Sequence, residues 1–371
     1  MSHRLNAKGI SLDFRAKGGV VTDLVIEDEG HRIAPYHHAP WAEKSIDLPE
    51  GAPAHQAWLQ GDFLAAPFGP SAFGLHGAAN LGWTPLTQGA DHLRAVLDHP
   101  IHGASVIKEI SLEDDHPFLY QRHLFIGGQG ALPVANHAMF ALGDGAKLSF
   151  SRKRWFETSA ETLESDPARG RSKLAYPRRS EDPSAFPAQD GGSVDLLTYP
   201  WGEAHEDFVS ALEEPSSTLG WTAIARPAQK DLILTLRDPR KLPMTALWHS
   251  NGGRDYAPWN GSHRGCLGVE EGALLTELGL SSRESPDPLS AAGQPPLLQL
   301  QPLGAVEIRH ITGALHWPSG QRVANVMLEG DLLTVTGDWG AERKLPIRGA
   351  WLRDTAASEV QKPKLDPDWP F

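Results

Sequence analysis

The chain has 371 residues and carries 34 Lys and Arg against 46 Asp and Glu, which gives a formal net charge of −12. Nucleic-acid binding needs a concentrated basic surface, so this acidic balance argues against a nucleic-acid partner. The sequence also has no stretch of 18 consecutive apolar residues and no apolar signal-peptide core near its N-terminus. We therefore expect a cytoplasmic protein with no membrane partner.

The predicted elements are short strands separated by turns. Glycine (37 residues) and proline (30 residues) are spread through the whole chain, which is typical of many turns. Several runs alternate between apolar and polar residues, as in a sheet with one dry and one solvated face. In chain order, we expect strands at residues 20–26, 104–112, 119–126, 231–236, 305–311 and 332–337.

The remaining segments complete the expected fold. Residues 203–212 are the best helical candidate, and segments 157–192 and 281–296 are expected to be surface loops or lids. Strand-rich sequence of the same character resumes after each of these two segments, so neither is interpreted as a linker. We therefore predict an all-β protein of antiparallel sheets in one domain over residues 1–371, ending in a tail from residue 354.

A glycine-rich segment at residues 74–83 contains the first candidate binding residues. His76 lies between a leucine and a glycine, where its imidazole could project into a cleft. Trp83 offers a flat apolar face that can stack on sugar C–H groups and an indole N–H that can donate to a hydroxyl. Taken alone, a structural histidine that caps a turn is the commoner interpretation.

A second segment, residues 132–142, is apolar except for Asn136 and His137. Two buried polar side chains need hydrogen-bond partners, and a strand that lines a polar groove would supply them. From the residues alone, a structural role and a binding role are equally favoured.

A third segment combines Trp248, Arg254 and Trp259, a composition suited to a polyol ligand. A short apolar strand then ends in Glu270 and Glu271. Adjacent residues of a strand face opposite ways, so at most one of these carboxylates points into a given groove. A solvated turn residue is the commoner interpretation of either glutamate alone.

Together, a histidine and a carboxylate can act as general acid and general base near neutral pH. Sugar mutarotation needs such a pair: a base takes the proton of the anomeric hydroxyl while an acid protonates the ring oxygen as the ring opens. The reaction requires no metal and no organic cofactor, so we expect neither.

Three motifs resemble those of the aldose 1-epimerase (galactose mutarotase-like) superfamily. Residues 75–78 (Leu-His-Gly-Ala) are similar to its Leu-His-Gly-Gly motif, and residues 136–140 to its Asn-His-x-Tyr/Phe-Phe motif. Residues 267–270 (Leu-Gly-Val-Glu) resemble its Gly-apolar-Glu strand end. The three occur in the family's order, at comparable separations. The resemblance implies a galactose mutarotase-like sandwich and an isomerase that acts on a monosaccharide or sugar derivative.

Carried over residue by residue, the resemblance implies His137 as the general acid and Glu270 as the general base. His76 would bind the sugar, and Glu271 would be the base if the strand register were shifted by one. Asn136 of the second motif is a further candidate sugar ligand.

The chain departs from the family pattern in one respect that affects substrate preference. The family has an arginine ahead of the first histidine, whereas residues 61–69 contain none, and Asp62 is the candidate replacement for binding a hydroxyl. The family's intermediate aspartate is not placed by the sequence, and its candidates are Asp195, Asp207 and Asp255.

Other functions remain open at this stage. A sugar-binding protein without turnover is the main alternative, and related sandwiches also host lyases and hydrolases. A metal enzyme is disfavoured because the close histidine pairs, 37–38 and 99–102, lack a carboxylate at convincing spacing. Cys266 is the single cysteine, so no intrachain disulfide forms, as is usual in a reducing compartment.

Overall fold

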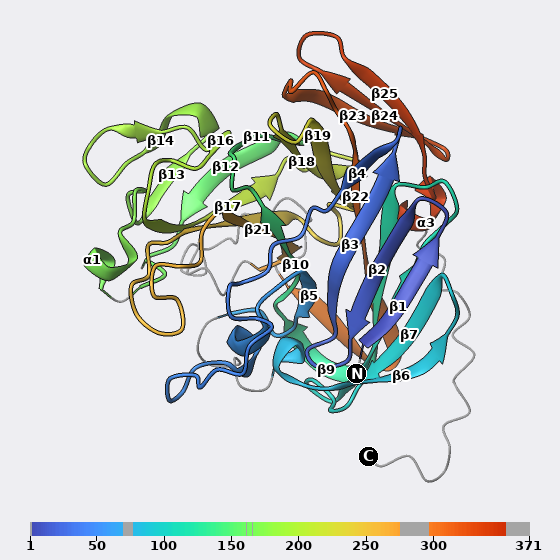
Figure 1. Cartoon of the computed structure of the whole chain (residues 1–371). Coiled ribbons are helices and arrows are strands. Elements are labelled where there is room, and N and C mark those ends of the chain that lie inside the picture. The colour runs from blue at the N-terminus through green and yellow to red at the C-terminus, as the bar shows by residue number, and fades with distance from the viewer. Residues whose placement is uncertain (1, 70–76, 161, 165, 275–296, 354–371) are drawn as a thin grey trace.

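Two large antiparallel sheets pack face to face (Figure 1). The computed structural model describes residues 2–69, 77–160, 162–164, 166–274 and 297–353. The larger sheet has eleven described strands, in the spatial order β1 (Ser2–Ala7), β2 (Ile10–Arg15), β3 (Val20–Asp28), β5 (Asp62–Ala65), β10 (Val134–Ala141), β21 (Cys266–Ala273), β20 (Met244–Asn251), β17 (His205–Glu213), β12 (Lys153–Thr158) and β13 (Arg178–Ser180), with β4 (His31–Ile33) paired to β3.

The second sheet has nine described strands, in the spatial order β16 (Thr198–Tyr199), β11 (Ala146–Phe150), β18 (Gly220–Arg226), β19 (Asp231–Arg237), β22 (Leu298–His316), β9 (Phe118–Leu132), β8 (Ala104–Ser111), β7 (His92–Leu97) and β6 (Trp83–Gln88). A three-stranded sheet, drawn in red at the top of Figure 1, packs on its outer face. Its strands are β23 (Val323–Glu329), β24 (Leu332–Gly337) and β25 (Glu342–Pro346).

The remaining described elements are short. They are the pair β14 (Phe186–Pro187) and β15 (Ser193–Val194), the helices α1 (Pro167–Gly170) and α3 (Gly349–Arg353), and the 3₁₀ turns η1 (Ala54–Trp58), η3 (Ala78–Asn80) and η4 (Pro183–Ala185). In the described part of the chain, no helix has the length and apolar character needed to span a bilayer.

The predicted all-β antiparallel sandwich is confirmed, and the six predicted strand runs fall on β3, β8, β9, β19, β22 and β24. Segment 157–192 contains short elements and turns where it is described, and segment 281–296 and the tail from residue 354 lie outside the described residues. The single domain over residues 1–371 stays a prediction.

The helix predicted at residues 203–212 is wrong, because this segment forms strand β17. The strand lies inside the larger sheet between β12 and β20, and all nine of its residues are buried. A strand covered on both faces loses the simple apolar–polar alternation by which strands are found in a sequence. Some of its polar side chains are bonded across the sheet, as in the hydrogen bond from Ser250 to Glu206.

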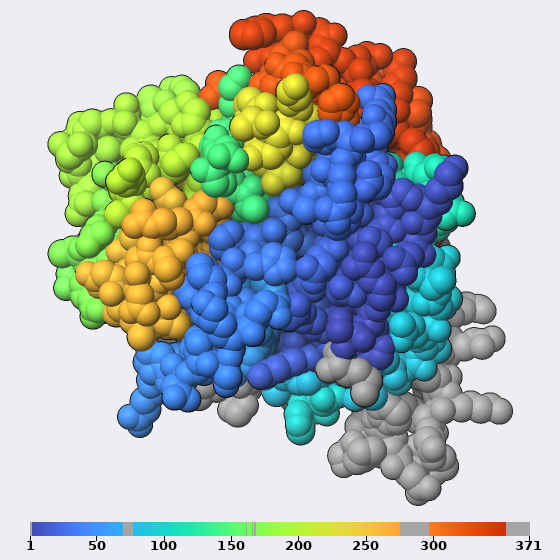
Figure 2. Space-filling view, viewed as in Figure 1, coloured from blue at the N-terminus to red at the C-terminus, as the bar shows by residue number. Residues whose placement is uncertain are grey.

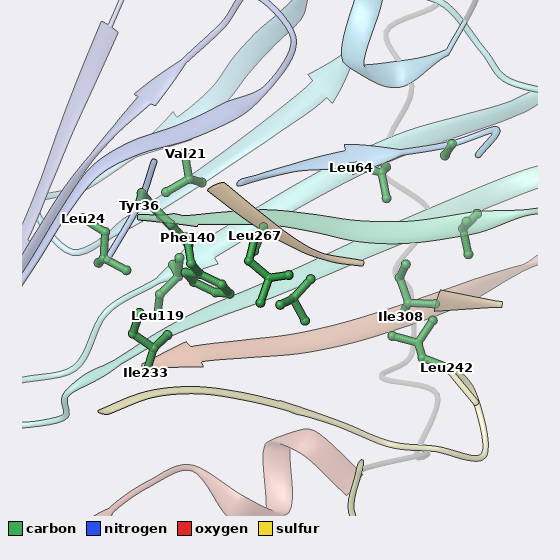
Figure 3. Close-up of a cluster of buried hydrophobic side chains, with 14 of the residues drawn as sticks. Val21, Leu24, Tyr36, Leu64, Leu119, Phe140, Ile233, Leu242, Leu267 and Ile308 are labelled. Carbon is green, nitrogen blue, oxygen red and sulfur yellow. The ribbon is translucent and has the colours of Figure 1, made fainter. Parts of the chain in front are cut away.

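The main core lies between the two sheets (Figure 3). Apolar side chains from one face of each sheet meet there, among them Val21, Phe140 and Leu267 from the larger sheet and Leu119 and Ile308 from the smaller one. Burying a side chain of this size stabilises the fold by about 1.5–3 kcal/mol. This burial fixes which face of β10 and β21 points inward, and therefore which side chains the same strands present outward.

A second apolar cluster covers the outer face of the larger sheet. Alternate residues of β5, β10, β17, β20 and β21 contribute to it, and side chains from residues 39–59 and from Trp259 pack over them. In Figure 2 the gold atoms around residue 260 lie against the blue atoms of the N-terminal part, consistent with the edge-on contact of Trp41 and Trp259. The polar groups that this cluster encloses form the candidate site.

Candidate functional site

The site is centred on a histidine–carboxylate pair on adjacent strands. In the antiparallel register of β10 and β21, His137 is directly opposite Glu270. Directly opposed side chains point to the same face of the sheet. Here His137 Nε2 lies 3.1 Å from Glu270 Oε1. The His137 side chain is 12% exposed and that of Glu270 is 3% exposed, so solvent reaches the pair from the histidine side.

Aromatic rings surround this pair. Phe63, opposite His137 on β5, stacks on the imidazole with ring centroids 4.5 Å apart and planes 17° apart. Trp248 of β20 meets His137 edge-on, with centroids 6.0 Å apart. The residue of β21 that pairs with Trp248 is Gly268. A side chain at position 268 would crowd the tryptophan, since an added Cβ would lie 3.1 Å from the Cβ of Trp248.

The electrostatic environment favours a protonated His137. Burial alone would lower the pKa of His137, but the charge and hydrogen bond of Glu270, with a smaller contribution from Asp62, raise the pKa above its usual value of 6.5. A protonated imidazole beside an ionised carboxylate is the starting state for an acid and a base that act together.

A second carboxylate lies on the same outer face. Glu206 of β17 accepts hydrogen bonds from the indole N–H of Trp248 and from the Ser250 hydroxyl. Arg254 Nη1 lies 3.4 Å from Glu206 Oε1, and the Arg254 guanidinium stacks over the ring of Trp259 at 4.4 Å. Burial raises the pKa of Glu206 above its usual value, although Arg254 and the two hydrogen bonds oppose this shift.

Four residues predicted to bind substrate or to catalyse are therefore grouped with Trp248 on one face. They are His137, Glu270, Arg254 and Trp259.

Asp62 and Asn136, predicted as sugar ligands, lie on the opposite face of the same strands. Both are fully buried. Asn136 Nδ2 donates to Asp62 at 2.7 Å, Gln121 of the second sheet donates to Asp62 at 2.6 Å, and the Tyr36 hydroxyl donates at 3.3 Å. These contacts join the two sheets inside the sandwich. Asn136 immediately precedes His137, so strand alternation alone sends its side chain inward.

The other predicted ligands are distributed differently. Trp83 is 2% exposed, packs in the main core and donates its indole N–H to the carbonyl of Ala78. His76 lies outside the described residues. Glu271, the fallback base, faces the interior, where its carboxylate pairs with Arg237 at 2.8 Å and His310 at 2.9 Å.

The three candidates for the intermediate aspartate have partners elsewhere. Asp207 accepts the backbone N–H groups of residues 173 and 174, and its carboxylate lies 3.3 Å from His205. Asp255 pairs with Arg169 at 3.3 Å. Asp195 pairs with Arg322, also at 3.3 Å.

Sequence reasoning missed Phe63 and Glu206. Phe63 follows Asp62, and strand alternation would have assigned the two side chains to opposite faces. Glu206 fell in the segment predicted as a helix, which concealed its alternation with Asp207. Their positions follow from pairings with residues 137 and 250, which are distant in the sequence.

The arrangement of these sheets defines a galactose mutarotase-like β-sandwich, and comparison with solved structures shows the same fold. A candidate aldose 1-epimerase from Escherichia coli K12 superposes with a TM-score of 0.55 at 14% identity, covering 85% of this chain and 98% of that one. A galactose mutarotase related enzyme from Lactobacillus acidophilus gives 0.52 at 11% identity, covering 85% and 97%. An aldose epimerase homologue from C. elegans gives 0.51 at 11% identity, covering 85% and 100%.

At the level of sequence, no family model matches the chain, and no curated protein matches it. The likeness to these three structures is therefore one of fold. This likeness of fold agrees with the distant resemblance to the aldose 1-epimerase superfamily that the motifs around His137 and Glu270 indicated.

Proposed function

We propose that this protein is an aldose 1-epimerase-like isomerase that interconverts the anomers of a monosaccharide or sugar derivative. The observation that carries the proposal is the contact between His137 Nε2 and Glu270 Oε1, 3.1 Å apart on the outer face of the larger sheet. The two residues are 133 positions apart in the sequence. The contact supports the proposal because a histidine and a carboxylate could serve as the acid and the base that anomer exchange requires.

In the proposed reaction, the sugar presents its anomeric hydroxyl to Glu270 and its ring oxygen to His137. Glu270 accepts the proton of the C1 hydroxyl, and His137 gives its proton to the ring oxygen as the C1–O5 bond breaks. The open-chain aldehyde turns about its C1–C2 bond. Reversal of both proton transfers then closes the ring on the other face of C1, and both residues return to their initial states without any net gain or loss of protons.

The surroundings of the pair suit a sugar. Trp248 borders His137 edge-on, and Arg254, whose side chain is 13% exposed, carries hydrogen-bond donors for the hydroxyls of a pyranose. Because Arg254 also contacts Glu206 and Glu164, its guanidinium is held in position before a ligand binds. Such positioning lowers the entropy cost of binding.

A polarimetric assay over a panel of pure α-anomers tests the proposal. The wild-type protein should accelerate equilibration of at least one sugar, and Glu270→Gln should lower that rate by roughly 10²–10⁴ while keeping most of the affinity. Glu329→Gln, which changes an exposed strand glutamate, is the matched control and should leave the rate unchanged.

Two results would contradict the mechanism. Full activity of Glu270→Gln would remove this carboxylate from the reaction. Saturable sugar binding without acceleration of any anomer would instead identify a sugar-binding protein on the same fold.

A further inference from the structure

Two histidines and the only cysteine of the chain come together on the outer face of the larger sheet. A ring nitrogen of His37, a ring nitrogen of His263 and Sγ of Cys266 all lie within 4.8 Å of one another. His263 and Cys266 are 1% and 0% exposed, and His37 is 9% exposed. We propose that these three side chains form a Zn²⁺-binding site, separate from the His137–Glu270 pair.

The backbone places the three ligands firmly. His37 is anchored to β10 and β5 because its N–H donates to the carbonyl of Met139 and its carbonyl accepts from Gly61, both at 2.9 Å. The carbonyl of His263 accepts a 2.7 Å hydrogen bond from Gly252. Cys266 is the first residue of β21. The ion would therefore link the N-terminal segment, the connection between β20 and β21, and the sheet itself.

The hydrogen bonds of His263 leave one nitrogen ready to bind a metal. Its Nδ1 lies 2.7 Å from the Ser250 hydroxyl, which donates to the carboxylate of Glu206 at 2.9 Å. A hydroxyl has one proton, and here it goes to Glu206, so the hydroxyl accepts from Nδ1–H. The lone pair of His263 is then on Nε2. A carboxylate that fixes a histidine tautomer through an intermediate group is a common arrangement around metal ligands.

The two Nε2 atoms lack partners in the described part of the chain. Both His37 Nε2 and His263 Nε2 are buried without a hydrogen bond. Buried polar atoms are usually satisfied, so two such atoms beside a thiol call for an explanation.

The donor set favours zinc. Imidazole nitrogen and thiolate sulfur are its usual ligands, at about 2.0–2.1 Å and about 2.3 Å, so ligand atoms less than 4.8 Å apart need only small shifts to reach a common ion. A bound cation would take the place of the proton of the buried Cys266 thiol.

The ion would also hold the aromatic rings of the candidate sugar site. His263 stacks on Trp248 with centroids 5.4 Å apart and planes 15° apart, and it meets Trp259 edge-on at 5.3 Å. Sequence spacing alone does not reveal this site, because His37 lies more than 220 positions before His263 and Cys266.

Titration of the metal-free, reduced full-length protein with Co²⁺ and Zn²⁺ tests the proposal without any sugar present. One equivalent of Co²⁺ should bind and give a thiolate-to-cobalt charge-transfer band that one equivalent of Zn²⁺ abolishes. Cys266→Ala, a small change in a buried position, should remove the band. Ser250→Ala removes the hydrogen bond that fixes the tautomer of His263, and it should weaken the affinity for Co²⁺ by roughly 10–100-fold.

The exposed His99→Ala variant is the control and should bind like the wild type. Absence of a stoichiometric charge-transfer band in the folded wild-type protein would overturn the proposal, and so would a band that persists in Cys266→Ala. Because the readout is metal binding alone, its failure would leave the proposed isomerase activity untouched, and loss of that activity would leave the metal site untouched.

Discussion

Glu270 and Glu271 are consecutive residues of β21, and their carboxylates lie on opposite faces of the larger sheet. Glu270 contacts His137 at 3.1 Å on the outer face, where the histidine is partly exposed. Glu271 contacts Arg237 at 2.8 Å between the two sheets, where both side chains are fully buried. The same substitution at these two positions should therefore affect different properties: the reaction rate at Glu270 and the stability at Glu271.

We expect Glu271→Gln to destabilise the fold by about 3 kcal/mol, since removing one member of a buried ion pair leaves its partners with uncompensated charge. Arg237 keeps its 2.7 Å contact with Glu213, which limits the loss. Urea denaturation followed by tryptophan fluorescence measures the change. Glu329→Gln on the exposed side of β23 serves as the control, and an equal effect of both substitutions would contradict the buried-pair interpretation.

The stability of the wild-type protein should fall in acid through the same residue. Burial alone would raise the pKa of Glu271, but Arg237, His310 and Lys153 lower it from 4.5 to about 2. A group whose pKa is lower in the folded state stabilises the fold above the unfolded-state pKa and loses this contribution as the pH falls through the folded-state value. Denaturation curves between about pH 5 and pH 2 should therefore show a steeper decline for wild type than for Glu271→Gln. Parallel declines would show that Glu271 does not carry the effect.

The pH dependence of isomerisation should report His137. Its raised pKa extends the protonated state of the imidazole to higher pH, and the ability to donate that proton is lost as the pH rises through the raised value. The wild-type kcat/KM should therefore fall on the alkaline side. His137→Gln should lose roughly 10²–10⁴ in rate and should also lose this alkaline decline. His99→Gln should keep both, and an unchanged alkaline limb in His137→Gln would assign that limb to another group.

The ion pair of His137 also contributes to stability, but this contribution is lost as the pH rises, whereas that of Glu271 is lost as the pH falls. A histidine whose pKa is raised on folding stabilises the protein fully below its unfolded-state pKa of about 6.5, and this contribution is lost as the pH rises through the folded-state value. Thermal denaturation of wild type and His137→Gln should accordingly converge toward alkaline pH. Divergence in that direction would contradict the assigned shift.

Trp259→Ala should weaken monosaccharide binding by roughly tenfold, because it removes the ring that packs beneath the Arg254 guanidinium at 4.4 Å and helps to hold this hydrogen-bond donor in position. Calorimetric titration with the preferred sugar measures the loss. Trp339→Ala changes a tryptophan that is 82% exposed and should not alter the affinity. Unchanged binding in Trp259→Ala would place the ligand elsewhere.

Strand alternation and turn residues were sufficient to predict an all-β chain, because each strand carries its own local signal, and the motif resemblance implied the sandwich. The strands at residues 20–26 and 332–337 are examples whose apolar residues face a core. The signal failed at β17, where neighbours cover both faces and polar residues such as Glu206 are satisfied by partners from other strands. A single sequence does not reveal these partners.

The site was predictable only in part, for the same reason. The motifs selected His137 and Glu270, and the structure brings these two side chains together. The second motif also contains Asn136, and Asp62 was the expected replacement for the family's arginine, but both side chains point inward. Which face of a strand is buried depends on how the sheets pack, so a motif of consecutive residues does not separate ligand-facing from core-facing positions.

The two-faced character of β10, β20 and β21 has a practical consequence for engineering this protein. Positions 137, 248 and 270 share a face with the aromatic rings, whereas 136, 247 and 271 face the other sheet. A combinatorial library that varies only the residues on the face of positions 137, 248 and 270 would sample new ligand preferences. It would leave the side chains that pack between the two sheets unchanged. Shifting that library by a single position would yield mostly unfolded variants.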